Sequence, residues 1–359
     1  MRRGFSVLIV ICLLSAFFTA CGSEKAEETQ PVIAEETVIP MPATTQEVIP
    51  EPVIVTEPVE VSEPVNDDFS LPKTGIRPFA VMIDNEGTRV LPQGGLNMAQ
   101  IVYEVIVEGG LTRLMPVFWG TEPEMIGPVR SARDYFLDYS MEYDAIYVHY
   151  GGSPQAGKDI PKFKINEIDG LYLGPDVFWD LTKDRGNWQD SYTSMEKLKA
   201  HALKKKFSET ASVEFPFIYN LTEVTPEAGN IATVITLKYP SMTSKYEYDS
   251  NTGLYKRFRY GKEHMERVSE KQFEAKNIIV QFVPNYDIKG DKAGRQEMNT
   301  IGSGKGYFIT NGRVIDLKWS KESRRAQTKY SDKDGNPILL NRGQTWIQIM
   351  PVNAKVTIE

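Results

Sequence analysis

The sequence predicts an α/β domain with a central mixed sheet, followed by a mainly antiparallel β domain. Up to about residue 225, short apolar segments alternate with segments of helical periodicity, which is typical of α/β folds. After residue 226, most segments alternate apolar and polar residues between turn sequences, which indicates strands joined by hairpins. Because residues 226–230 (Pro-Glu-Ala-Gly-Asn) are typical of a turn, we predict domains at 71–225 and 226–359.

The N-terminus has the pattern of a lipoprotein signal peptide. Arg2 and Arg3 precede an apolar stretch, Phe5 to Phe18, that is shorter than an ordinary membrane-spanning helix. Small residues then lead to Cys21, as in a bacterial lipobox, although Phe18 stands where leucine is usual. We therefore expect a signal peptide at 1–20, acylation (palmitate) at Cys21, and a lipid-anchored protein on the extracellular face of the cell membrane. A retained anchor helix is the alternative.

The cysteine and charge content exclude several classes of site. Cys12 would leave with the signal peptide and Cys21 would carry lipid, so the mature chain keeps no thiol for a disulfide, a nucleophile or a metal. The three histidines are scattered along the sequence, and we predict no metal and no cofactor. The chain has 41 basic and 48 acidic residues, a net charge of −7; without Arg2 and Arg3 it is 39 − 48 = −9. This acidic balance excludes nonspecific nucleic-acid binding.

Residues 21–70 predict a disordered, acidic, proline-rich tether. Acidic residues dominate this segment, Lys25 is its single basic residue, and no aromatic residue precedes Phe69. Such a composition cannot bury enough apolar surface to offset chain entropy, and repulsion between like charges extends the chain. We interpret it as a spacer between the membrane and the folded part, with docking through its Val–Ile pairs as the alternative. Residues 71–75 (Leu-Pro-Lys-Thr-Gly) match a sortase pentapeptide, but a globular domain follows, so we interpret them as a turn.

In the first domain, apolar segments bounded by polar turns predict four strands, and periodic segments predict three helices. The lysine-rich helix would place Met195, Leu198, Ala202 and Leu203 on one face. The predicted strands are 78–85, 101–108, 111–119 and 145–150, and the predicted helices begin at 96, run from 127 to about 141, and run from 191 to 207.

The segment Gly127–Phe136 contains the strongest candidate site. Pro128 suits the first turn of a helix, and Arg130 and Arg133 would then share a helix face. Two guanidinium groups at the positive end of a helix, with the Ser131 hydroxyl beside them, predict a site for a phosphate or carboxylate. The alternative is that acidic residues of the same domain neutralise both arginines, such as Asp134, Asp138 or Glu104.

Further polar residues lie where predicted strands end, and functional groups gather at such ends in α/β sheets. The predicted ligand-binding residues are Arg113, Arg130, Ser131, Arg133, Gly151, Gly152 and Ser153. Here Gly151 and Gly152 would offer backbone amides to an anion. We assign no catalytic residue, since Ser153 beside His149 lacks a Gly-x-Ser-x-Gly elbow. Two interpretations apply to Asp84, Glu104 and Glu108. These acidic residues bind a divalent ion, or they form structural salt bridges.

The second domain predicts strands and turns. Asn311-Gly312 between two alternating segments is the strongest hairpin signal in the chain. Residues 285–303 predict a long, mobile loop, and 332–336 a plain turn rather than a calcium loop. The basic run 318–329 predicts a solvated face or a contact with an anionic polymer or with lipid headgroups. The predicted strands are 231–239, 245–249, 254–260, 277–283, 306–310, 313–319 and 343–349.

Several motifs resemble those of the YerB-like lipoproteins of Gram-positive bacteria. In the first domain they are Arg77–Asn85, Glu108–Arg113, Gly127–Arg133 and His149–Ser153. The similarity extends from Leu71 to Pro351, and it implies a two-domain exported lipoprotein of a family without a settled activity. The second domain contributes Gly306–Phe308, Trp319–Lys321 and Gly343–Trp346.

The sequence therefore predicts a non-catalytic, membrane-anchored envelope lipoprotein that binds an anionic ligand through residues 127–133. The expected ligand is a wall polymer, a lipid-linked phosphate or a partner protein, and not a nucleic acid. The alternative is an envelope hydrolase or phosphotransferase that acts on phosphate or glycan linkages. In that alternative, His149 would act as base and Asp84 or Glu108 as acid or metal ligand.

Overall fold

The computed structural model describes residues 69–182 and 190–359. The predicted signal peptide, the lipidation site Cys21 and most of the predicted tether lie outside the described residues. The chain divides into two units, Met1–Val59 and Glu60–Glu359, and only the second contains described residues. In the described ranges, no helix has both the length and the apolar character needed to cross a membrane.

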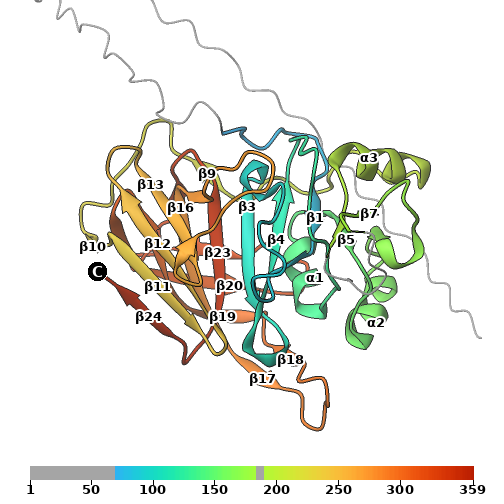
Figure 1. Ribbon diagram of the computed structural model, residues 1–359. Helices are drawn as coiled ribbons and strands as arrows, with labels where there is room; N and C mark the ends of the chain where they lie inside the picture. The colour runs from blue at the N-terminus through green and yellow to red at the C-terminus, as the bar shows by residue number, and fades with distance from the viewer. Residues whose placement is uncertain (1–68, 183–189) are drawn as a thin grey trace, which may run out of the picture. The chain divides into compact units, whose positions relative to one another are not determined.

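A mixed sheet of 12 strands runs through both predicted domains (Figure 1). Its strands are β1 Phe79–Val81, β2 Ile83–Asp84, β3 Ile101–Ile106, β4 Thr112–Phe118, β5 Ile146–His149, β6 Glu167–Asp169, β10 Asn230–Ile231, β16 Asn277–Val283, β19 Gly302–Thr310, β20 Arg313–Lys321, β21 Lys329–Ser331 and β23 Thr345–Pro351. Their order is β10-β20-β19-β16-β23-β3-β4-β1-β5-β6, with β2 beside β4 and β21 beside β20. The two halves of the chain meet inside this sheet, where β23 pairs in parallel with β3.

The four strands predicted in the first half are present with changed bounds. The segment 78–85 forms the two short strands β1 and β2, and the other three predicted strands correspond to β3, β4 and β5. Every residue of β3 and β4 is buried. Both faces of the sheet are therefore covered here, which explains why these strands do not alternate regularly between apolar and polar residues.

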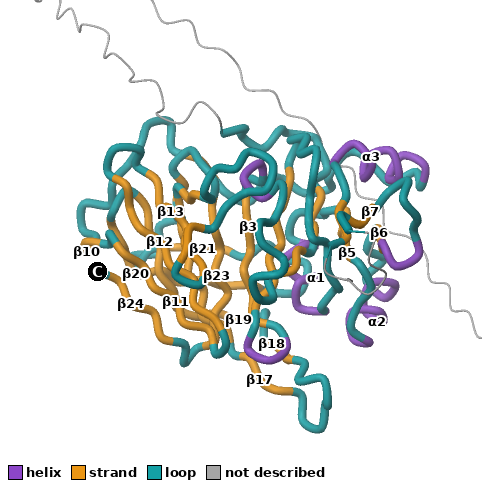
Figure 2. Tube along the Cα trace, viewed as in Figure 1, coloured by secondary structure: helices purple, strands orange, loops and turns teal. Residues whose placement is uncertain are grey.

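Three α-helices lie beside β5 and β6 at one end of the large sheet, shown in purple in Figure 2. They are α1 Asp134–Met141, α2 Pro154–Lys162 and α3 Met195–Lys204. Helix α3 confirms the predicted lysine-rich helix with Met195, Leu198 and Ala202 buried, but Leu203 is 65% exposed, so its predicted place on the buried face is wrong.

Helix α2 was not predicted, although the sequence contains its start signal. Ser153 caps the helix, since its Oγ accepts a hydrogen bond from the backbone N–H of Ala156, and Pro154 follows in the first turn. The helix predicted to begin at 96 is only a 3₁₀ turn, η1, Leu96–Met98; the other 3₁₀ turns are η2 Glu108–Gly110 and η3 Gly170–Tyr172.

The predicted helix start at Gly127 is wrong. Residues 127–133 are extended, and α1 begins only at Asp134, with Arg133 as its extended N-cap residue. Backbone hydrogen bonds tie this segment to distant partners: Arg130 N–H donates to the carbonyl of Met82, and Ala132 N–H to that of Gly151. Because these pairings satisfy the backbone polar groups, Arg130 and Arg133 do not share a helix face.

The second half adds a sheet of six strands, with all neighbouring strands antiparallel as predicted. Its strands are β11 Val234–Tyr239, β12 Met242–Asp249, β13 Leu254–Arg259, β14 Lys262–Glu263, β15 Glu274–Ala275 and β24 Lys355–Ile358. The predicted Asn311-Gly312 hairpin joins β19 to β20, and both turn residues have the positive φ of a type I′ turn. Two strands of this half depart from the antiparallel pattern, since β23 is parallel to β16 and β22 Leu339–Leu340 is parallel to β9 Ile218–Tyr219.

Part of the loop predicted at 285–303 is a hairpin. Its strands β17 Asn285–Asp287 and β18 Gln296–Met298 pair with each other, and β19 begins within the predicted loop at Gly302. This hairpin extends beyond the sheet at the bottom of Figure 1. The remaining short strands are β7 Trp179–Asp180 with β8 Ser191–Tyr192, and β9 Ile218–Tyr219 with β22 Leu339–Leu340.

Aromatic side chains pack between the two large sheets. The ring of Trp346 on β23 lies 6.1 Å from that of Tyr246 on β12 and 6.3 Å from that of Phe273. Shared strands and a shared core therefore join residues on both sides of position 226, within the unit Glu60–Glu359. The domain boundary at 225/226 remains a prediction.

Candidate functional site

Six of the seven predicted ligand-binding residues line one cavity of about 410 Å³. They are Arg113, Arg130, Ser131, Arg133, Gly152 and Ser153. Asp84, Glu86 and Glu108 line the same cavity, which we call the arginine cleft. The predicted candidates therefore converge, although they come from separate segments of the chain.

Strand pairing brings these segments together. Asp84 ends β2 and lies opposite Arg113 on β4, while Glu108 begins the 3₁₀ turn η2 just after β3 and Val107. The extended segment 127–133 lies beside both: its Val129 pairs with Ile83, and its Ala132 with Gly152 of the turn after β5. The sheet and this segment together set the positions of the charged side chains.

Carboxylates pair with both arginines of the 127–133 segment. Arg130 Nε lies 2.9 Å from Asp84 Oδ2, and its Nη2 lies 4.0 Å from the half-exposed Glu86. Arg133 Nε lies 2.5 Å from Glu108 Oε1. The alternative of internal ion pairing is therefore confirmed for these two residues, but the partners are not those that the sequence suggested.

Arg113 is less well compensated. Its Nη1 donates to the carbonyl of Ser131 at 2.6 Å, its Nη2 lies 3.8 Å from Glu108, and within the described residues its buried Nε has no hydrogen-bond partner. Burial and the nearby charges of Arg133 and Arg130 lower the pKa of Arg113 to about 10, against the opposing effect of Glu108 and Asp84. These three guanidinium groups thus face the buried Asp84, the partly buried Glu108 and the half-exposed Glu86, and Arg113 has the longest ion-pair contact to a carboxylate that is not half-exposed.

Glu108 is held in its charged form. Burial by itself would raise the pKa of Glu108, but the hydrogen bond and charge of Arg133, together with the charge of Arg113, lower it below its usual value. A carboxylate with a lowered pKa is unsuited to donate a proton at neutral pH. Glu108 therefore serves as a fixed negative charge between the two arginines.

His149 does not join the cleft. Its Nε2 lies 2.8 Å from Glu167 Oε2 and its Nδ1 lies 2.9 Å from the carbonyl of Gly151, so neither ring nitrogen is directed to Ser153. The Ser153 hydroxyl instead caps α2. The structure therefore gives no support to a nucleophilic Ser153 activated by His149.

The predicted role of the Gly151 amide is wrong. This N–H donates to Asp169 Oδ1 at 2.7 Å, so it is not available to an external anion. Gly151 also does not line the cleft, whereas Gly152 does. The turn after β5 contributes only Gly152 and Ser153 to the site.

Sequence reasoning missed two charged residues of the cleft, Glu86 and Arg295. Arg295, together with Ala293, reaches the cleft from the β17–β18 hairpin, a region predicted as a mobile loop. Its guanidinium group lies 2.6 Å from Asp291 within the same hairpin. Only the tertiary placement of this hairpin brings Arg295 to the site, and local sequence does not encode that placement.

The three acidic residues considered as ligands for a divalent ion are separated by ion pairing. Glu104 is fully buried and pairs with Arg257 at 2.7 Å, while Asp84 and Glu108 pair with arginines of the cleft. Across the part of the chain that the structure describes, no group of three or more His, Cys, Asp or Glu side chains is placed to hold a metal ion.

A network of buried polar side chains lies next to the arginine cleft and includes Asn85, the residue after Asp84. The Asn85 amide donates to Thr112 Oγ1 at 2.8 Å, and Arg259 donates to both oxygens of Asn85. His264 belongs to the same network: its Nδ1 accepts a hydrogen bond from Arg257 Nε at 3.0 Å. The ring is therefore neutral, with its proton on Nε2.

We predict that His264 makes stability fall in mild acid. Burial, with the charges of Arg257 and Arg259, lowers the pKa of His264 well below its usual value, so the unfolded chain takes up a proton first. Below about pH 6.5 the free energy of unfolding should therefore decrease by about 1.4 kcal/mol per pH unit from this residue. Urea unfolding between about pH 5 and 7.5 measures this slope.

The control for this prediction is His201, which lies on helix α3 outside the network. His264→Gln should flatten the slope between pH 5 and 6.5, whereas His201→Gln should leave most of it in place. An unchanged slope in His264→Gln would contradict the assignment.

Comparisons with known proteins agree with the motif similarity. Residues 70–208 match the family described as "Protein of unknown function (DUF3048) N-terminal domain", and residues 235–347 match its C-terminal domain. The Bacillus subtilis (strain 168) protein "Putative lipoprotein YerB" is 32% identical over 279 residues, which cover 77% of this chain and 81% of the relative.

A solved structure that carries the name of this relative, YerB, has the same fold as this chain. The crystal structure of the YerB protein from Bacillus subtilis matches with a TM-score of 0.70 and 29% sequence identity, over 79% of this chain and 94% of that chain. This chain belongs to the YerB-like family, whose members combine a DUF3048 N-terminal domain with a DUF3048 C-terminal domain.

Proposed function

We propose that this protein is a membrane-anchored cell-envelope lipoprotein that binds an anionic ligand in the arginine cleft. One observation carries the proposal: Arg113, Arg130 and Arg133 line a single cavity in which Asp84 pairs with Arg130 and Glu108 with Arg133, while the nearest ion-pair contact of Arg113 is 3.8 Å long, to Glu108. An anion from outside would complete the charge balance around Arg113. The expected ligand group is a phosphate or carboxylate, because the planar guanidinium fork matches both.

The proposed location rests on the N-terminal sequence and on the relative. The basic start, apolar stretch and lipobox-like Cys21 support acylation and display on the extracellular face of the membrane. The Bacillus subtilis relative carries the word lipoprotein in its name. A tether of about 50 residues would then let the cleft reach a wall polymer, a lipid-linked phosphate or a partner protein.

An entering ligand would replace the longest ion-pair contact of the cleft, that between Arg130 and Glu86. Glu86 is half-exposed and lies 4.0 Å from Arg130, whereas Asp84 is buried and lies 2.9 Å from it. An incoming anion would therefore displace Glu86 into solvent and keep the Asp84 contact. The Ser131 hydroxyl at the cleft wall adds a neutral donor for an anionic oxygen.

The cleft does not favour the alternative of a hydrolase or phosphotransferase. Asp84 and Glu108 line it, but both are held in ion pairs with arginines, and His149 is bound to Glu167 elsewhere. These contacts leave none of the three side chains placed as a general acid or base for a ligand in the cleft.

Removal of Arg113 should test the binding proposal without leaving a carboxylate of the cleft unpaired, because Arg133 remains bound to Glu108. We expect Arg113→Met to weaken the binding of inorganic phosphate at least about 10-fold, because it deletes the least compensated cation while Asp84 and Glu108 keep their arginines. Isothermal titration at low ionic strength measures the dissociation constants, and added salt should weaken binding further.

The matched control is Arg89→Met, the same substitution at an exposed arginine outside the cleft. It should bind phosphate as the unmodified protein does. Equal affinities for Arg113→Met and Arg89→Met, or no phosphate binding by the unmodified protein at about 10 mM, would contradict anion binding in the cleft.

A further inference from the structure

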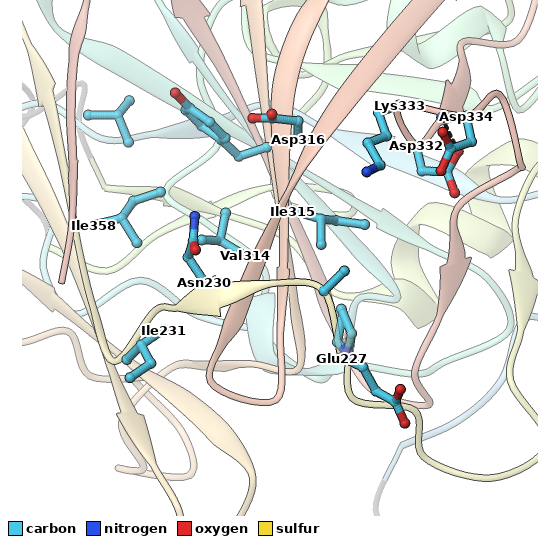
Figure 3. Close-up of a pocket in the computed structure, with 14 residues that line it drawn as sticks. Glu227, Asn230, Ile231, Val314, Ile315, Asp316, Asp332, Lys333, Asp334 and Ile358 are labelled. Carbon is cyan, nitrogen blue, oxygen red and sulfur yellow. Dashed lines mark hydrogen bonds between the residues drawn. The ribbon is translucent and has the colours of Figure 1, made fainter.

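A second cavity, of about 570 Å³, lies against the outer edge of β20 and shares no residue with the arginine cleft (Figure 3). Residues of β20 form its centre, and β10, β24 and the turn after β21 contribute its walls. We call it the β20-edge groove. None of the predicted ligand-binding residues lies in it.

Part of a strand edge is uncovered in this groove. Beside β20, the strand β10 pairs only as far as Val314, and β21 pairs from Lys318 to Ser320. In the described ranges, residues 315–317 therefore have no strand neighbour on the outer side. The edge strand β24 of the other sheet also borders the groove, and among the described residues it pairs with β11 alone. Uncovered strand edges are templates for the addition of another strand.

The backbone N–H and C=O groups of Asp316 point to the outer side of β20, where residues 315–317 have no neighbouring strand among the described residues. Alternate residues of an antiparallel strand direct their N–H and C=O groups to the same side. The carbonyl of Gly312 accepts a hydrogen bond from Ala232 N–H on the outer side. By this alternation, Val314 and Asp316 also direct their backbone groups outward, and Val314 already faces Asn230 of β10.

The groove offers apolar contacts beside this edge. Ile231 is 62% exposed, and Ile315, Val356 and Ile358 line the same cavity from β20 and β24. An added strand directs alternate side chains to opposite faces, so aliphatic side chains spaced two residues apart can contact these groups.

The charged residues of the groove are mainly acidic. Figure 3 shows their side chains around β20, with Asp316 above Glu227 and the pair Asp332 and Asp334 to one side. Hydrogen bonds from the Asn336 side chain, and from the backbone N–H groups of Asn336 and Asp334, lower the pKa of Asp332, so it stays ionised. Four carboxylates thus surround one cation, Lys333.

We propose that the β20-edge groove binds a short, extended, basic segment of a partner protein by strand addition. The main chain of the segment would pair with Asp316, its aliphatic side chains would contact Ile231 and Ile315, and its lysines or arginines would face the carboxylates. Main-chain pairing supplies affinity in this mode of recognition, and side-chain contacts supply specificity. Complementary charge selects a basic over an acidic partner.

Three synthetic peptides separate the elements of this proposal. The capped peptide Val-Lys-Val-Lys-Val should bind the full chain and shift the amide resonances of residues 315–317. The acidic peptide Val-Glu-Val-Glu-Val should bind at least about 10-fold more weakly. A basic peptide N-methylated at alternate amides keeps its charge but lacks strand donors, and it should lose binding to a similar extent.

A charge reversal in the groove provides the matched test in the protein. Asp316→Lys should weaken binding of the basic peptide at least about 10-fold, whereas Glu263→Lys, the same charge change at an exposed site on β14, should not. Both residues are exposed, so neither variant should disturb folding.

Several outcomes would overturn the proposal. They are no binding of the basic peptide at about 1 mM, equal binding of the acidic peptide, equal binding of the N-methylated peptide, or equal loss of binding in both charge reversals. A second copy of this chain is the other possible occupant of the groove, and sedimentation of the unmodified protein measures self-association. Self-association that Asp316→Lys abolishes would assign the groove to a second copy instead of a basic partner segment.

Discussion

Arg257→Ala is expected to lower the free energy of unfolding by about 3–5 kcal/mol, because it leaves the carboxylate of Glu104 buried without a partner. The two side chains are 0% exposed, and Arg257 Nη2 lies 2.7 Å from Glu104 Oε2. The guanidinium group also lies 4.3 Å from the ring centroid of Trp346 in the core. Urea unfolding monitored by tryptophan fluorescence measures the change.

Two further variants serve as controls for the Arg257→Ala prediction. Lys329→Ala breaks the exposed pair with Glu322 and should change stability little. In the Arg257→Ala background, Glu104→Gln should recover part of the loss, because it removes the unpaired buried charge. The prediction is wrong if Arg257→Ala is as stable as Lys329→Ala.

Lys321→Ala is expected to cost a similar amount, about 3–5 kcal/mol, for the same physical reason. Lys321 Nζ lies 2.7 Å from Glu142 Oε1, and their side chains are 0% and 2% exposed. The basic run 318–329 was interpreted as a solvated face or a contact with a polymer; for Lys321 and for Arg324, which pairs with Asp138 at 2.5 Å, both interpretations are wrong.

The loss in Lys321→Ala should depend on pH with a defined sign. Burial already raises the pKa of Glu142, against the opposing charge of Lys321, and removal of the lysine should raise it further. A carboxyl whose pKa is higher in the folded state than in the unfolded state loses stability as pH rises above its unfolded value, about 4.3. The deficit should therefore be larger at about pH 8 than at about pH 5, and a deficit that is equal at both would contradict this account.

Both ion pairs connect the first half of the chain to the second. Glu104 and Glu142 precede residue 226, whereas Arg257 and Lys321 follow it. Each half thus contains buried charges that only the other half neutralises. This explains why the two family domains share one core within the unit Glu60–Glu359.

Local sequence was sufficient to predict the strands of six or more residues and the Asn311-Gly312 hairpin, but not most of the shorter strands. Apolar runs identified the buried strands of the first half, and a two-residue turn that requires positive φ identified the hairpin. The same local reasoning was wrong for residues 127–133, where Arg-Ser-Ala-Arg suits a helix. Tertiary pairing of Arg130 with Met82 and of Ala132 with Gly151 outweighs that preference.

The residues of the arginine cleft were predictable, but their partners were not. Positions at strand ends identified Asp84, Glu108 and Arg113, because strands of one sheet bring their ends together. Which carboxylate pairs with Arg130 or Arg133 depends on register and on the path of segment 127–133. Sequence spacing contains no information on either.

The position of β23 has a consequence for the order in which the chain acquires its structure. This strand lies near the C-terminal end of the sequence, yet its neighbours in the sheet are β3 on one side and β16 on the other. A chain that emerges from its N-terminus must therefore hold β3 with one uncovered edge until residues 345–351 arrive. Nascent or prematurely terminated copies expose that edge, where chaperones or identical unfinished chains can attach.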